Sequence, residues 1–165
     1  MKFDKIALLV LYLLAIGVFI IANQMTPDPG TASGNGNPAL AIVWILFPLF
    51  IAIVILWVRI FRLSRMNIAI YISSIFALLI HLLVASVYRQ KELNDYRELI
   101  KNVLLNREGV ADEDYIQAIT SGLSFHINHL NFNLNTYVMF VSFSLLVAIV
   151  YTLWNIWEIK NESQK

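Results

Sequence analysis

The chain has 165 residues, of which 59% are hydrophobic and 14% are charged. A soluble domain usually carries about 25% charged residues, and a water-soluble core of this length could not bury so much apolar surface. The composition therefore predicts an integral membrane protein. A formal net charge of +1 gives no reason to expect nucleic acid as a partner, and the absence of cysteine excludes disulfides, thiolate metal sites and iron–sulfur clusters.

Four apolar runs approach or reach the length that a helix needs to cross about 30 Å of hydrocarbon. Backbone amides find no water inside a bilayer, so each continuous run is predicted to be a helix rather than a strand of a membrane barrel. The predicted spans cover residues 6–22, 39–58, 68–88 and 137–157. We therefore expect an all-α integral membrane protein, a single polytopic domain over residues 1–165 with four transmembrane helices.

The first run follows two lysines, as the apolar part of a secretory signal does. A signal cleavage site needs small residues in a characteristic pattern, and residues 20–23 (IIAN) fit that pattern poorly, so we expect an uncleaved span. Residues 23–38 are rich in Gly, Pro, Ser, Thr and Asn, which predicts a flexible, exposed linker with no fold of its own. Pro48, in the middle of the second span, removes a backbone hydrogen bond and predicts a kink.

The basic residues near the ends of the spans predict the orientation of the chain. Seven of them flank the predicted spans on one side, at Lys2, Lys5, Arg59, Arg62, Arg65, Lys160 and Lys165. The first link on the other side, residues 23–38, has none. We therefore expect a multi-pass protein of the plasma membrane with both termini in the cytoplasm and with residues 23–38 and 89–136 outside.

The third span has small and polar residues along one predicted face, at Ser74, Ala77, His81, Ala85 and Tyr88. His81 is the only strongly ionisable side chain well inside a span, and such groups are costly unless they are paired or hydrated. One reading is a functional site around His81. The other is a hydrogen bond in a helix–helix interface, which the neighbouring alanines favour because small residues let membrane helices approach closely.

Residues 89–136 form the one sizeable segment predicted to lie in water. Leu93, Tyr96 and Ile100 recur at helical spacing with no break before Gly109, which predicts one long helix leading out of the membrane. A second amphipathic helix is predicted to begin near Asp112, with Gly122 as a candidate bend and an extended or kinked approach to span four as an alternative. The expected result is an extracytoplasmic amphipathic helical hairpin between spans three and four.

His126 and His129 lie three residues apart, so on a helix they would be neighbours. A metal site would need further ligands, for which Asp112, Glu113, Asp114 or His81 are the candidates. The competing interpretation is a polar collar of histidines and asparagines where the chain approaches the membrane. No metal or other cofactor is assigned from this pattern, because established signatures contain more ligands at defined spacing.

The fourth span carries a second stripe of small and polar residues. Its members, spaced by three or four, are Ser144, Ala148, Thr152 and Asn155. Such a stripe is typical of a helix–helix interface in a membrane.

The sequence contains no nucleotide-binding loop and no acidic residue inside the predicted spans. We therefore expect a small non-enzymatic membrane protein of bacterial type that acts through protein–protein contacts, as an accessory subunit, an immunity-like protein or an assembly factor. Its partner would be another membrane protein or a second copy. One alternative is a transport or sensing module with a polar path along Ser74, His81 and Tyr88. Another is a metal-binding membrane enzyme that uses His81, His126 and His129.

Overall fold

The computed structural model describes residues 2–31, 36–64 and 67–162. Within these ranges the chain is helical and contains no strand. The long helices are α1 (Lys2–Asn23), α2 (Leu40–Ser64), α3 (Ile68–Glu108) and α6 (Leu134–Glu162). Each is long and apolar enough to cross a membrane, which confirms the all-α fold and the four potential spans. Arg65, Lys165 and residues 32–35 of the predicted linker lie outside the described residues.

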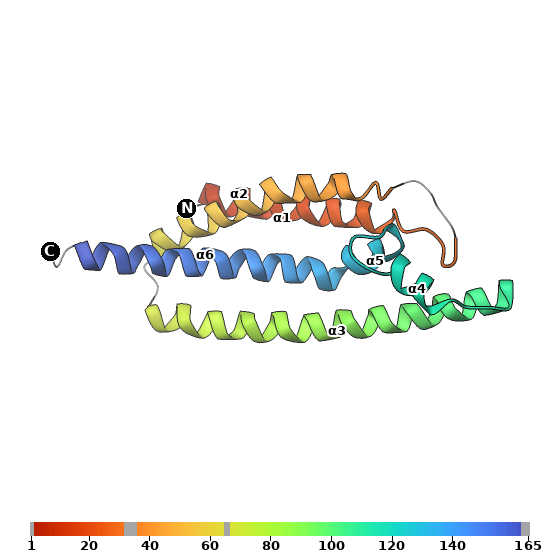
Figure 1. Cartoon of the computed structure of the whole chain (residues 1–165). Coiled ribbons are helices and arrows are strands. Elements are labelled where there is room, and N and C mark those ends of the chain that lie inside the picture. The colour runs from red at the N-terminus through yellow and green to blue at the C-terminus, as the bar shows by residue number, and fades with distance from the viewer. Residues whose placement is uncertain (1, 32–35, 65–66, 163–165) are drawn as a thin grey trace.

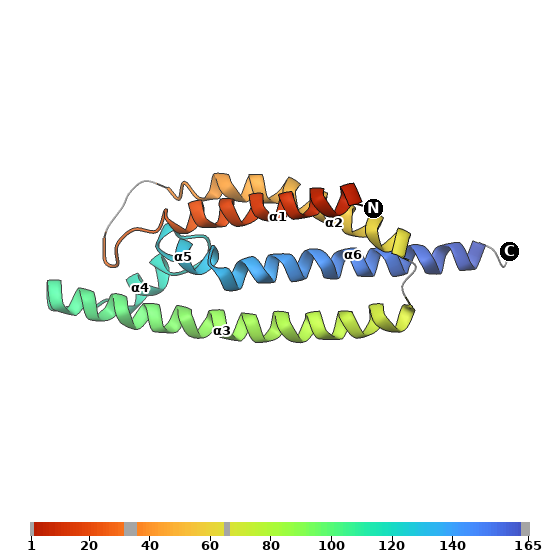
Figure 2. The same cartoon turned by 180° about the vertical axis from the view of Figure 1, so that it is seen from behind.

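The helix α6 occupies the centre of the arrangement. It packs against α2 and α3, while α1 packs mainly against α2. Figure 1 and Figure 2 show the α1–α2 pair on one side of α6 and α3 on the other. The helices α2 and α3 meet at one end of the molecule, where the rings of Phe61 and Tyr71 lie edge to face at 5.5 Å.

Aromatic rings and small residues form the contacts between these helices. The ring of Phe19 lies 5.7 Å from that of Phe132 and 5.5 Å from that of Tyr137, both edge to face. Ala15 and Ala148 are fully buried, and their small side chains allow the helix backbones to approach each other closely. Apolar packing of this kind is what holds helices together where water is absent.

The predicted long helix leading out of span three is confirmed. The helix α3 has 41 residues without glycine or proline, beginning after Asn67, whose side chain accepts a hydrogen bond from Ala69 N. It ends at Gly109, which has a φ of 73° and donates its backbone N–H to the Leu105 carbonyl. Only glycine adopts this left-handed conformation without a steric cost, so Gly109 explains where the helix stops.

The second helix of the predicted hairpin is shorter than its periodicity suggested. It begins where expected, because the Asp112 carboxylate accepts hydrogen bonds from Asp114 N (2.9 Å) and Tyr115 N (3.3 Å). However, α4 (Glu113–Ile119) ends after seven residues, and Gly122 follows with a φ of 60°. The chain then forms a short 3₁₀ helix, η1 (Phe125–Ile127), and one helical turn, α5 (Asn128–Asn131).

We call residues 89–108 the arm and residues 112–133 the cap. The cap folds back along the arm and buries two apolar clusters against it. One contains Ile100, Leu104 and Ile116, and the other contains Leu93, Ile127 and Leu130. Part of the apolar periodicity of residues 89–136 is therefore buried between arm and cap, whereas Leu123 is 55% exposed, and three short helical segments replace one long helix.

Pro48 does not interrupt α2, which is a single helix from Leu40 to Ser64. The proline is exposed. The predicted kink stays a prediction.

Candidate functional site

Two of the predicted span-three residues, His81 and Tyr88, line one pocket between α3 and the start of α6. The pocket has a volume of about 440 Å³, and its other lining residues are Glu92, Asn133, Leu134, Asn135 and Val138. The amide of Asn135 donates to the Ala85 carbonyl at 3.0 Å, which fixes α6 against α3 beside this pocket. Within the described part of the chain, the buried Nδ1 of His81 has no hydrogen-bond partner.

The remaining members of the predicted span-three stripe do not share one environment. Ala85 is buried, Ser74 is half-buried and Ala77 is exposed. The structure therefore brings His81, Ala85 and Tyr88 to the same end of the α3–α6 contact and leaves Ala77 on the open surface of α3.

The predicted stripe of α6 is largely buried. Ser144 and Ala148 are fully buried and Thr152 is 3% exposed. The hydroxyl of Ser144 donates to the Val141 carbonyl at 2.7 Å, and the hydroxyl of Thr152 donates to the Ala148 carbonyl at 2.7 Å. These hydroxyls are satisfied within their own helix, so the stripe packs without unpaired hydroxyl groups.

A hydrogen-bonded triad that the sequence analysis did not single out connects three helices beside this stripe. Trp57 Nε1 of α2 donates to the Tyr12 hydroxyl of α1 at 2.7 Å, and that hydroxyl lies 3.4 Å from the Ser144 hydroxyl of α6. Tryptophan and tyrosine usually find a hydrogen-bond partner when they are buried. The triad therefore fixes the relative positions of α1, α2 and α6.

His126 and His129 belong to the cap and lie against aromatic rings. His126 is 2% exposed, with its ring centroid 4.1 Å from that of Phe125. The ring of His129 lies 4.4 Å from that of Tyr96 on the arm. Burial lowers the pKa of both histidines, because a charged imidazolium would lose its hydration, although the Glu92 carboxylate acts in the opposite direction on His129.

A metal site at these histidines gains no further ligand from the fold. Among residues 2–31, 36–64 and 67–162, no group of three or more His, Asp or Glu side chains is placed to hold a metal ion. The metal-binding alternative stays a prediction without a structural candidate.

Asparagine side chains connect the cap to the segment before α2 and to the end of α1. Asn128 is fully buried and exchanges two hydrogen bonds with Asn37, at 2.9 and 3.0 Å. The amide of Asn23 donates to the carbonyls of His129 (3.2 Å) and Phe132 (3.1 Å). Both described ends of the predicted linker are therefore attached to the cap, and no local sequence pattern predicts these pairings.

The arginines of the arm are also bonded within the molecule. Arg89 donates to the side chain of Asn131, Arg97 donates to the side chain of Thr120, and Arg107 donates to the Gly30 carbonyl. These contacts attach the cap and the first link to the arm.

Large apolar side chains are exposed around the far end of the arm. We call residues 105–115 the tip. Leu105 is 43% exposed, Val110 is 71% exposed and Tyr115 is 37% exposed. Leu105 lies 17 residues beyond Tyr88, roughly 25 Å at helical rise. The tip thus lies well beyond the end of the apolar run of α3.

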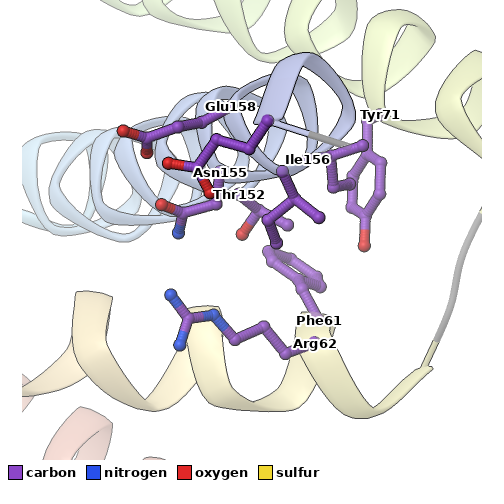
Figure 3. A pocket seen from close by; sticks show the side chains of 9 residues that line it. Phe61, Arg62, Tyr71, Thr152, Asn155, Ile156 and Glu158 are labelled. Atoms are coloured by element: carbon purple, nitrogen blue, oxygen red, sulfur yellow. The ribbon is translucent and has the colours of Figure 1, made fainter. Parts of the chain in front are cut away.

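A second pocket lies at the opposite end of the molecule, where α2 ends and α3 begins (Figure 3). We call it the end pocket, and its volume is about 670 Å³. The residues that line it are Phe61, Arg62, Tyr71, Thr152, Asn155, Ile156, Glu158, Ile159 and Glu162. Of these, Thr152 and Asn155 belong to the stripe predicted in the fourth span, and Arg62 is one of the basic residues that predict the orientation.

An ion pair stabilises the same end of the molecule. The guanidinium of Arg59 in α2 lies 3.1 Å from the carboxylate of Asp4 in α1, and the Asp4 side chain is only 5% exposed. Arg59, one of the basic residues that predict the orientation, therefore also pairs with Asp4 in the fold.

Comparisons with protein families, with characterised proteins and with solved structures found no match to this chain.

Proposed function

We propose that this chain is a non-enzymatic multi-pass membrane protein that binds another membrane protein through the tip of its arm. The observation that carries the proposal is the exposure of Leu105, Val110 and Tyr115 at the tip. Exposed apolar residues on the spans need no explanation in a membrane, because lipid covers them. Lipid does not reach a surface about 25 Å beyond the end of a span, and clustered apolar side chains in water mark an interaction site.

The charge of the tip indicates the chemistry of the partner. Residues 105–115 contain four acidic residues and a single basic one, Arg107, whose guanidinium is bonded to the Gly30 carbonyl. Glu113 pairs with Lys101. The remaining carboxylates favour a basic partner surface and oppose anionic lipid. Two copies in one membrane would present these acidic tips at the same height, so repulsion opposes a homodimer through this surface.

The proposed orientation places both termini in the cytoplasm and the arm and cap outside the plasma membrane. It is supported by the distribution of lysine and arginine along the chain. Because the natural chain has no cysteine, single-cysteine labelling is a clean test. Val110→Cys in intact cells is expected to react with a membrane-impermeant maleimide, whereas Lys5→Cys should react only after the membrane is permeabilised. The reverse pattern would overturn the orientation.

Photo-crosslinking in native membranes tests the partner proposal. A photoreactive amino acid at position 105 or 110 is expected to give one discrete adduct with a protein that has a basic outer surface. With the probe at position 105, Val110→Asn should abolish the adduct. With the probe at position 110, Leu105→Asn should abolish it. The same probe at the exposed Asn94, lower on the arm, is the matched control. Adducts with lipid or with a second copy only, or no adduct at all, would contradict the proposal.

A second candidate function is a transport or sensing module, favoured by the pocket that His81 and Tyr88 share. The unpartnered Nδ1 of His81 would form a hydrogen bond with a ligand in the pocket. His81→Gln keeps the polarity of the position but removes the imidazole. If any pH-dependent phenotype of the cells is the same with His81→Gln as with the natural chain, this candidate should be abandoned.

A further inference from the structure

The end pocket combines groups of opposite charge that the fold does not neutralise. The side chain of Arg62 extends from α2 toward Thr152 and Asn155 on α6, and Tyr71 of α3 lies at the other side (Figure 3). Over the described parts of the chain, Arg62, Glu158 and Glu162 form no ion pair within 4.0 Å. The pocket therefore holds an available cation and two available carboxylates.

A buried hydrogen-bond donor faces the same space. The amide nitrogen of Asn155 is buried and has no partner among the described residues, although Asn155 lines the pocket. A buried polar group without a partner costs about 1–3 kcal/mol, so a water molecule or a ligand atom that bonds this amide would stabilise the site. Arg62 and Asn155 together offer N–H donors to an anion such as a phosphate.

The position of the pocket at the ends of the helices indicates what kind of ligand reaches it. It lies at the ends of three apolar helices, and Trp154 and Trp157, in the same turns of α6 but not part of the lining, are 61% and 58% exposed. Exposed tryptophans near the end of a span are typical of the boundary between hydrocarbon and headgroups. Phe61, Ile156 and Ile159 supply an apolar wall, which suits the glycerol and the first methylenes of an acyl chain.

We propose that the end pocket binds the headgroup of a phospholipid that carries a phosphate and a primary ammonium group. Arg62 and Asn155 hold the phosphate, and Glu158 and Glu162 accept hydrogen bonds from the ammonium. A purely anionic headgroup would be repelled by the two carboxylates. A quaternary ammonium has no N–H to donate to them, so an ethanolamine headgroup fits better than a choline headgroup.

Native mass spectrometry of the full chain in detergent tests this assignment. With equal amounts of lipids of identical acyl chains, the ethanolamine lipid is expected to bind more tightly than the choline or the glycerol lipid. Arg62→Gln should weaken binding of the ethanolamine lipid about tenfold or more, because it removes a charge-assisted contact to the phosphate, and Arg62→Lys should restore part of it. The double variant Glu158→Gln/Glu162→Gln should abolish the preference for ethanolamine over choline.

The control is Lys5→Gln, which removes an exposed charge at the same end of the molecule but outside the pocket. It should leave lipid binding unchanged, and the thermal midpoint of Arg62→Gln should match that of the natural chain. Equal binding of all three lipids, or equal loss with Lys5→Gln, would overturn the proposal. Competition by free phosphoethanolamine as strong as by the lipid would also overturn it, by showing that the ligand is a soluble compound.

Discussion

The cap and the spans of this protein are held together by different interactions. In the cap, apolar clusters combine with amides that bond to backbone carbonyls far away in the sequence, as Asn23 does with His129 and Phe132. Between the four long helices, aromatic rings, alanines and branched aliphatic side chains pack together. With the four long helices in a bilayer and the cap in water, as proposed, the difference would follow from the solvent, since removing apolar surface from water stabilises the cap but gives no comparable gain between helices in lipid.

The largest effect is expected from a cavity created in the apolar contact between the arm and the cap. Ile100 is fully buried between the arm and α4, so Ile100→Ala should destabilise the folded cap by about 2–5 kcal/mol. Hydrogen–deuterium exchange over residues 113–131 measures the change. The matched control is Leu99→Ala, at a side chain that is 46% exposed. An equal loss of protection in both variants would show that apolar burial does not hold the cap.

Removing one buried amide should come next. Asn128→Ala removes both hydrogen bonds to the side chain of Asn37, which keeps its bonds to Leu123 and Ala39, and it removes the bond to the Met25 carbonyl. A buried group left unpaired costs roughly 1–3 kcal/mol. We expect a lower thermal midpoint and faster exchange at both the cap and residues 23–31. Asn102→Ala, at an exposed position of the arm, should change neither.

A span is expected to respond to added volume more than to a lost polar contact. Ala148 is fully buried where α6 meets α2 and α3, so Ala148→Leu should destabilise the packed helices by about 1–3 kcal/mol through steric strain. Val150→Leu adds volume on an exposed face of the same helix and should be neutral. The thermal midpoint in detergent compares the two, and a neutral Ala148→Leu would show that this contact is loosely packed.

The smallest effect is expected from acidification, and it should be confined to the cap. Burial lowers the pKa of His126 and His129 below the ordinary value of 6.5, so below that pH the unfolded state binds more protons than the folded state. The stability of the cap is therefore complete above about pH 6.5 and decreases as the pH falls below it. Proton NMR titration of the two imidazoles should give midpoints below 6.5, and a midpoint above it for either would contradict the buried environment.

The sequence was sufficient to predict elements whose signal is local. The four apolar runs, the uninterrupted α3 and its end at Gly109 depend on composition and on neighbouring residues. The early end of α4 was harder to predict from neighbouring residues, because Thr120, which follows this helix, is bonded to Arg97, 23 positions earlier. Sequence periodicity reports the face of a helix and not its partner, which is why Ala77 was grouped with Ala85 although only Ala85 is buried.

The candidate sites were predicted only in part, because each draws residues from separate segments. His81 and Tyr88 were singled out and do share a pocket, but Asn133 and Asn135 reach it from the start of α6. The end pocket needs the end of α2, the start of α3 and the last turns of α6 together. Of the asparagines interpreted as a collar beside the membrane, Asn128 donates to the Met25 carbonyl, 103 positions earlier, and Asn135 donates to the Ala85 carbonyl on α3.

The continuity of α3 has a mechanical consequence. Its 41 residues contain no glycine or proline, so they form a rod about 60 Å long that carries Tyr71 of the end pocket near its start and Leu105 of the tip near its finish. A tilt of only about 5° around the first turn would move the far end by about 5 Å. A small displacement of α3 against α6 near Tyr71 would therefore become a larger displacement at the tip.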